Sequence, residues 1–171
     1  MDEPSAFSIM LTDLMAFLDG PGMPAGAILV SALFATTAAM LSIWWTRRTT
    51  RQRETIALIL SVHWDKDYIE ARNFFIEKRD SNEGLESCAT DQKSDDFKKV
   101  AQILNHYEVM SVGINHGILC SKIYREWNMT RFVEDWRKSE SLIASIRGRR
   151  ENPRLFDQFE RTAKKWQKRL K

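Results

Sequence analysis

The chain has 171 residues, which is room for one modest domain plus an anchor and too few for two large domains. Its 43% hydrophobic and 29% charged residues are ordinary for a globular protein and exclude disorder along the whole length. The charge is unevenly spread: the first 45 residues hold four acidic residues and no Lys or Arg, whereas the rest holds all 26 basic residues against 19 acidic ones. This asymmetry favours a membrane or nucleotide setting over a freely soluble enzyme.

The first predicted element is an amphipathic helix over residues 6–19. Its large apolar residues recur at helical i, i+3 and i+4 spacing, with the polar residues off that face. Because the segment is too short to cross a bilayer, we expect it to lie in the outer interface of the membrane. A short extracytoplasmic helix that packs on neighbouring copies is the alternative. The Gly and Pro residues of 20–24 then end the helix.

Residues 25–45 are predicted to form a transmembrane helix. These 21 residues carry no charge, and as a helix they span roughly 30 Å, the thickness of the hydrocarbon core. Trp44 and Trp45 suit the interface, and the basic flank 46–53 follows directly. Positive charge on this side alone predicts a single-pass protein of the cell inner membrane, with its N-terminus outside and its C-terminal domain in the cytoplasm. The acidic start and the long apolar run favour a retained anchor over a cleaved signal peptide.

One face of this helix is made of small residues, which let helix backbones approach closely in lipid. We therefore expect a homo-oligomer, with a tetramer as one candidate; the small residues are Ser31, Ala32, Ala35, Ala38, Ala39 and Ser42. If a pore forms, only Ser and Thr hydroxyls are available to line it. The absence of acidic or basic residues from the span argues against a proton relay.

Residues 54–171 are predicted to form the cytoplasmic helical domain. Residues 54–62 are apolar enough to continue the membrane helix as a stalk, and the next helix runs from Asp65 to about Arg79. Residues 80–94 lack periodicity and predict an exposed loop. A clear apolar stripe then predicts a helix from Asp95 to a stop at Gly117.

Three more helices are predicted towards the C-terminus. Ser121 is expected to cap a short helix, Thr130 to cap a second that runs to about Arg149, and Asn152-Pro153 to start the last one. No segment shows convincing strand alternation. The predicted fold is all-α: an N-terminal amphipathic helix, one transmembrane helix and a small cytoplasmic helical bundle.

The sequence offers no catalytic constellation. The motifs GxxxxGK[ST], GxGxxG, HExxH and GxSxG are absent, so we predict no enzyme activity and no cofactor. Cys88 and Cys120 lack CxxC spacing and read as free thiols of a reducing compartment. His106 and His116 lie about 15 Å apart along one predicted helix and cannot share a metal within one chain.

Two regions are candidates for ligand binding. A polar tract interrupts the apolar helix, and either satisfied packing or a ligand contact would explain it; its residues are Asn105, His106, Tyr107, Asn115 and His116. The C-terminal 25 residues are strongly basic, which fits a solvated or lipid-facing surface as well as a phosphate site. In the second case Arg147, Arg149 and Arg150 would grip phosphates.

The stretch from Phe97 to Trp166 resembles a bacterial family of single-span proteins with a helical cytoplasmic domain, found in prophage or mobile-element settings. The residues that carry the likeness are ILNHYE at 103–108, VGINHGIL at 112–119, DW at 135–136, RGRRENP at 147–153 and FDQFE at 156–160. This resemblance brings no activity with it.

In layout alone, the chain also looks like the small membrane effectors of type III CRISPR systems. In those proteins a cyclic oligoadenylate binds a cytoplasmic oligomeric domain and perturbs the membrane part. The resemblance implies an antiviral effector with membrane lipid and a cyclic nucleotide as partners, and without DNA. The alternative is a prophage or host membrane protein that excludes superinfection or docks a partner without a small-molecule ligand.

Overall fold

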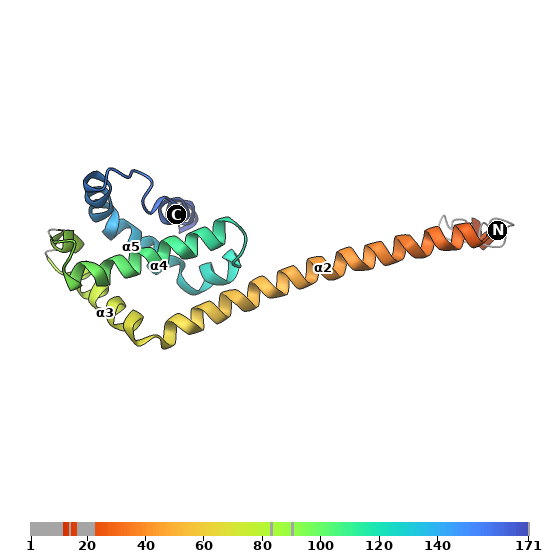
Figure 1. Ribbon diagram of the computed structural model, residues 1–171, viewed down its shortest axis with the longest axis horizontal. Helices are drawn as coiled ribbons and strands as arrows, with labels where there is room; N and C mark the ends of the chain where they lie inside the picture. Colours follow the sequence, from red (N-terminus) through yellow and green to blue (C-terminus); the bar gives the residue numbers. More distant parts are fainter. Residues whose placement is uncertain (1–11, 14, 17–22, 83, 90, 171) are drawn as a thin grey trace, which may run out of the picture. The chain divides into compact units, whose positions relative to one another are not determined.

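The computed structural model describes residues 12–13, 15–16, 23–82, 84–89 and 91–170. The described chain is helical and contains no strand, so the all-α prediction is confirmed. It falls into two compact units, one ending at Thr49 and the other beginning at Thr50. The elements, coloured along the chain in Figure 1, are α2 (Met23–Trp64), α3 (Lys66–Asp80), the short 3₁₀ helix η1 (Leu85–Ala89), α4 (Asp95–Asn115), α5 (Ser121–Arg149) and α6 (Asp157–Leu170).

The apolar part of α2 is exposed over its full circumference. Leu29, Phe34, Met40 and Trp45 each show more than 60% of their surface, and α2 is long and apolar enough to cross a membrane. The core helix of a soluble protein would instead be mostly buried. The hydroxyl of Thr36 donates to the carbonyl of Ala32 at 2.9 Å, so it is satisfied within its own helix, as hydrocarbon surroundings require.

The predicted interfacial helix at 6–19 lies largely outside the described residues. Within it, Thr12, Asp13, Met15 and Ala16 are helical. The predicted stalk at 54–62 is part of α2, which is helical without a break to Trp64.

Within the second unit, the last turns of α2 contact the bundle by one face. Leu58 and Ile59 pack against the hydrophobic core, and the hydroxyl of Thr55 accepts a hydrogen bond from the Cys120 amide at 2.7 Å. Asp65 separates α2 from α3 and caps the start of α3, because its carboxylate accepts hydrogen bonds from the amides of Asp67 and Tyr68. This cap fixes where α3 leaves α2.

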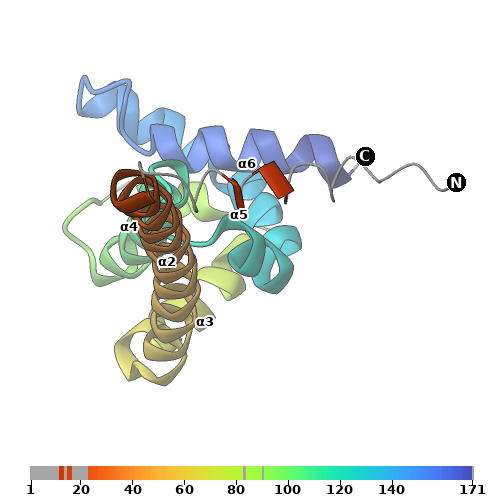
Figure 2. The ribbon, with the colours of Figure 1, turned by 90° about the vertical axis from the view of Figure 1, so that its right-hand side faces the viewer.

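The core of the second unit lies between α3, α4, α5 and α6. The helix α4 packs against α3 and α6, and α6 also lies along α5 (Figure 2). Aromatic rings fill the centre: Tyr107 stacks on Phe159 with ring centres 4.8 Å apart, and Phe132 meets both rings edge-on. Trp166 of α6 is fully buried and lies 4.8 Å from Phe132. Burial of these large rings holds the four helices together.

The loop predicted at 80–94 is partly wrong, because the segment contributes to the core. Its middle forms η1, in which Leu85 and Cys88 are buried. Two isolated apolar residues in a polar segment have no periodicity, and only their contact with the other helices reveals them. The helix that follows begins where predicted, with the Ser94 hydroxyl accepting from the Phe97 amide.

The predicted break at Thr130 is also wrong, since α5 runs unbroken from Ser121 to Arg149. Tyr124, Asn128, Phe132 and Asp135 continue one buried face past that point. Packing of this face against the bundle outweighs the weak capping preference of one threonine.

The last helix begins later than predicted, at Asp157 rather than at Asn152-Pro153. Phe156 adopts a positive φ of 60° while its ring is buried, so the chain turns sharply there. The preceding turn is fixed by the Asn152 side chain, which accepts from the Arg154 amide at 3.1 Å, and by Arg147, which donates to the Leu155 carbonyl at 2.8 Å.

Candidate ligand-binding site

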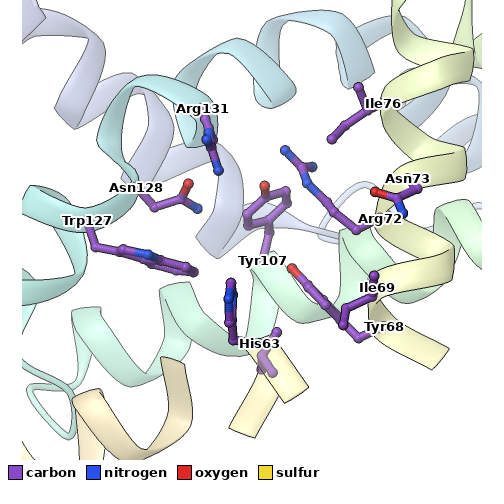
Figure 3. Close-up of a pocket in the computed structure, with 11 residues that line it drawn as sticks. His63, Tyr68, Ile69, Arg72, Asn73, Ile76, Tyr107, Trp127, Asn128 and Arg131 are labelled. Carbon is purple, nitrogen blue, oxygen red and sulfur yellow. The ribbon is translucent and has the colours of Figure 1, made fainter. Parts of the chain in front are cut away.

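A cavity of about 250 Å³ opens in the second unit where the end of α2, the start of α3, α4 and α5 meet (Figure 3). Two guanidinium groups and several aromatic and amide side chains line it, without any carboxylate. The lining residues are Val62, His63, Tyr68, Ile69, Arg72, Asn73, Ile76, Tyr107, Trp127, Asn128 and Arg131. The cavity therefore combines positive charge with ring surfaces.

One of these guanidinium groups belongs to a buried ionic cluster. Asp135 is fully buried, and its two oxygens lie 2.6 Å from Arg72 Nη1 and 2.7 Å from Arg79 Nη1. The Tyr107 hydroxyl donates to the oxygen that Arg72 approaches, at 2.5 Å. Burying a charge is costly unless it is paired and hydrogen-bonded, and α3 and α4 supply the partners of Asp135 here. The cluster fixes Arg72 at the edge of the cavity.

Arg79 is held from the outside as well. Asp80 accepts two hydrogen bonds from Arg79 at 2.8 Å, while Glu134 lies 3.7 Å away, and both carboxylates are about half exposed. These two acids therefore give Arg79 further partners besides Asp135.

Tyr68 and His106 form a second layer beside the cluster. Their rings meet edge-on with centres 4.8 Å apart. Burial, together with the positive charge of Arg72, lowers the pKa of His106 to about 4, so its imidazole is neutral at neutral pH. Burial raises the pKa of Tyr68 to about 12, which keeps this phenol protonated as a donor.

The opposite wall comes from one turn of α5. Trp127 is 45% exposed, Asn128 is nearly buried, and Arg131 is exposed. In Figure 3, Arg131 and Arg72 project from opposite walls towards the space above the Tyr107 hydroxyl. Trp127 and His63 lie below the Tyr107 ring in this view. The geometry is suited to an anion that also carries a flat ring.

The polar tract predicted as a ligand site is divided by the structure. Tyr107 lines the cavity and His106 supports Tyr68 behind it, whereas Asn105 is exposed on α4. Asn115 donates to Gln158 at 2.9 Å and to Thr162 at 3.1 Å, so it joins α4 to α6. His116 is the exposed C-cap residue of α4.

Glu108, which follows Tyr107 on α4, also connects α4 to α6. Its two carboxylate oxygens accept from the backbone amides of Gln158 and Phe159 at 3.3 and 2.8 Å. These are the first amides of α6, which have no partner within their own helix, and a negative charge is favourable there. Much of the unusual polarity of the tract is thus explained by the attachment of one helix to another.

The three arginines predicted in the basic tail lie at the far end of α5. Arg147 pairs with Glu160 at 2.8 Å, while Arg149 and Arg150 are exposed where α5 ends. Sixteen residues of helix separate Arg147 from Arg131, about 24 Å along the axis. The structure therefore does not bring these three residues to the cavity.

Sequence reasoning missed Tyr68, Arg72, Trp127, Asn128 and Arg131 as site residues. A signal for part of the site was present: Arg72 lies next to the apolar face of its helix, and Asp135 lies within the apolar stripe of α5. Opposite charges on two apolar faces indicate a buried pair, since neither is tolerated there alone. Among the described residues no group of three or more His, Cys, Asp or Glu side chains is placed to hold a metal ion.

The fold and the cavity define a class of protein. It is an α-helical bundle with a cavity lined by arginines and aromatic rings, and the helix α2, which contributes to that bundle, carries an apolar segment long enough to span a membrane. Residues 29–166 match the family described as domain of unknown function (DUF4760), and the chain belongs to this family. No curated protein and no solved structure matches the chain.

Proposed function

We propose that the protein is a membrane-anchored effector whose cytoplasmic bundle binds a nucleotide second messenger and acts on the membrane. The observation that carries this proposal is the composition of the cavity: two arginines, two tyrosines and a tryptophan without a lining carboxylate. Arginine forks bind phosphates and aromatic rings stack on bases. A cyclic oligoadenylate is the proposed ligand, in a setting of antiviral defence, and no catalytic step is proposed.

The link to the membrane is the helix α2. The helix that carries the exposed apolar segment also supplies Val62 and His63 to the cavity wall. A ligand that contacts this wall would favour one arrangement of the end of α2 over others, which is how binding energy shifts a conformational equilibrium. The proposed outcome is a pore or a disruption of the bilayer.

The proposed topology is a single pass through the cell inner membrane, with the N-terminus outside and the bundle in the cytoplasm. The basic residues Arg47, Arg48, Arg51 and Arg53 follow the apolar segment on one side only, which supports this orientation.

The proposed assembly is a homo-oligomer in which the small face of α2 meets other copies. Replacing Ala35 and Ala38 by Leu should reduce the oligomer seen by light scattering in detergent, because close helix approach is lost. Leu33→Phe adds bulk to the opposite side of the helix and serves as the control. An unchanged oligomer in the double variant would show that assembly does not use the small face.

A second candidate is the docking of a protein partner without any small ligand, as in superinfection exclusion. Val109 of α4 and Ile118 beyond it are apolar and more than 60% exposed in the second unit, which favours a contact surface there.

The two candidates separate in one experiment on the full chain in lipid nanodiscs. Titration calorimetry with cyclic tri-, tetra- and hexa-adenylate should give heat for at least one ring, whereas linear adenylates of the same length serve as controls. In liposomes that contain the protein and a trapped dye, the same ring should cause release. Neither heat nor release with any ring would refute the effector proposal.

A further inference from the structure

We infer that each chain holds one phosphate group between Arg72 and Arg131, with the attached aromatic group of the ligand against Trp127. This inference deepens the proposed function: it assigns the groups that contact the ligand and limits the recognised unit to one phosphate per chain.

The charge and geometry of the two arginines carry the first step. They come from different helices, α3 and α5, and project from opposite walls of the cavity (Figure 3). An anion between them would accept from both guanidinium groups, which are planar donors that suit phosphate oxygens. The hydroxyl of Tyr107 and the amide of Asn128 line the same space and supply neutral polar groups.

Arg72 is positioned by its ion pair with Asp135. Its Nη1 is buried and lies 2.6 Å from Asp135, but it lacks the alignment of a hydrogen bond, and the Tyr107 hydroxyl already donates to that oxygen. Asp135 also serves Arg79, so its charge is shared between two guanidinium groups. The ion pair with Asp135 holds the guanidinium group of Arg72 in place at the cavity wall, so little side-chain entropy is lost when a phosphate binds there.

The size of the cavity sets the unit that is recognised. At about 250 Å³ it is slightly smaller than typical small-molecule sites, which range from roughly 300 to 1,000 Å³. One nucleotide unit is therefore the largest piece expected within one chain, and a larger ring would have to be shared among copies. Trp127 is at the rim and 45% exposed, where its face is accessible to a base.

The phosphate could belong to a soluble nucleotide or to an anionic lipid headgroup, because the chemistry of the contact is the same. The test uses the full chain in phosphatidylcholine nanodiscs, titrated with AMP and with inorganic phosphate. Arg131→Ala should weaken AMP binding about tenfold or more. Arg137→Ala is the matched control, since Arg137 is also exposed on the same helix but does not line the cavity. Trp127→Ala should weaken the binding of AMP and leave the binding of inorganic phosphate unchanged.

The sources are separated by repeating the AMP titration in nanodiscs that contain phosphatidic acid. If phosphatidic acid weakens AMP binding to the unchanged protein but not to Arg131→Ala, the site binds a lipid headgroup. If phosphatidic acid leaves AMP binding unchanged, the site binds a soluble nucleotide. Both outcomes support a phosphate site at Arg131. Equal affinities of Arg131→Ala and Arg137→Ala, or no binding of any phosphate probe, would overturn the inference. AMP binding that depends on Arg131, together with no response to any cyclic oligoadenylate, would retain the site and reject the proposed function.

Discussion

Removing the charge of Asp135 tests whether the buried ionic cluster holds the bundle together. Asp135→Asn keeps the size of the side chain, so no cavity is made, but the amide nitrogen cannot accept hydrogen bonds and the negative charge is lost. Asp135 is fully buried, whereas the side chains of Arg72 and Arg79 are 15% and 10% exposed. Both cations would then be left in a largely dry interior without this partner.

Breaking a buried pair by removing one partner costs about 3–5 kcal/mol. The lower end applies here, because Arg79 retains two hydrogen bonds to Asp80. We therefore expect the free energy of unfolding to fall by about 3 kcal/mol. The measurement is urea unfolding of the full chain in a mild non-ionic detergent, followed by tryptophan fluorescence, with the slope of the transition checked for constancy.

The matched control is Glu134→Gln, at the neighbouring position. Glu134 is about half exposed and 3.7 Å from Arg79, so its loss should cost less than about 1 kcal/mol. If Asp135→Asn costs no more than Glu134→Gln, the cluster contributes nothing specific, and the role given to it in positioning Arg72 is wrong.

Three further predictions concern the same bundle. The pKa of His106 is about 4 in the folded chain against an ordinary 6.5, so the unfolded chain binds the proton first as the pH falls. The free energy of unfolding should therefore drop by about 3 kcal/mol between pH 6.5 and 4. His106→Gln should abolish that part of the pH dependence, as measured by urea unfolding. Glu108→Ala should cost about 1–2 kcal/mol and speed amide exchange at the start of α6, whereas Asn105→Ala, on the exposed side of α4, should change neither. Gly117→Ala should lower the thermal midpoint by an amount equivalent to about 1 kcal/mol, because φ is +68° there; an unchanged midpoint would show that the turn after α4 tolerates a side chain.

Local signals in the sequence were sufficient to predict a helix where the packing of the folded chain agrees with them. The starts predicted at Asp65 and Asp95 lie at or next to the caps of α3 and α4, which are Asp65 and Ser94. Each capping side chain lies within three residues of the amides that it bonds. The apolar segment of α2 is equally local, since length and lack of charge alone make it suited to a bilayer. The apolar stripe that predicted α4 is local in the same way, and five residues along it are buried: Phe97, Val100, Ile103, Leu104 and Tyr107.

Local signals misled where a distant element supplies the deciding contact. Thr130 has the chemistry of a cap, but burial of Phe132 and Asp135 against other helices keeps α5 continuous through it. The start of α6 depends on Glu108, which is about fifty residues away, so no short segment of sequence contains both partners. A cap provided by another helix exists only once the two helices have met.

The candidate site shows the same division. The sequence by itself determined that the chain has an apolar span, a basic and helical remainder, and polar residues in the middle of α4 that needed an explanation. The tertiary structure alone decided which of those residues meet. It places Tyr107 in one cavity with Arg72 of α3 and Arg131 of α5, and it places His106 against Tyr68. It uses Asn115 and Glu108 to attach α6. The physical reason is that a cavity depends on the crossing of helices, which is set by how their buried faces pack, whereas helix formation and membrane affinity depend on neighbours along the chain.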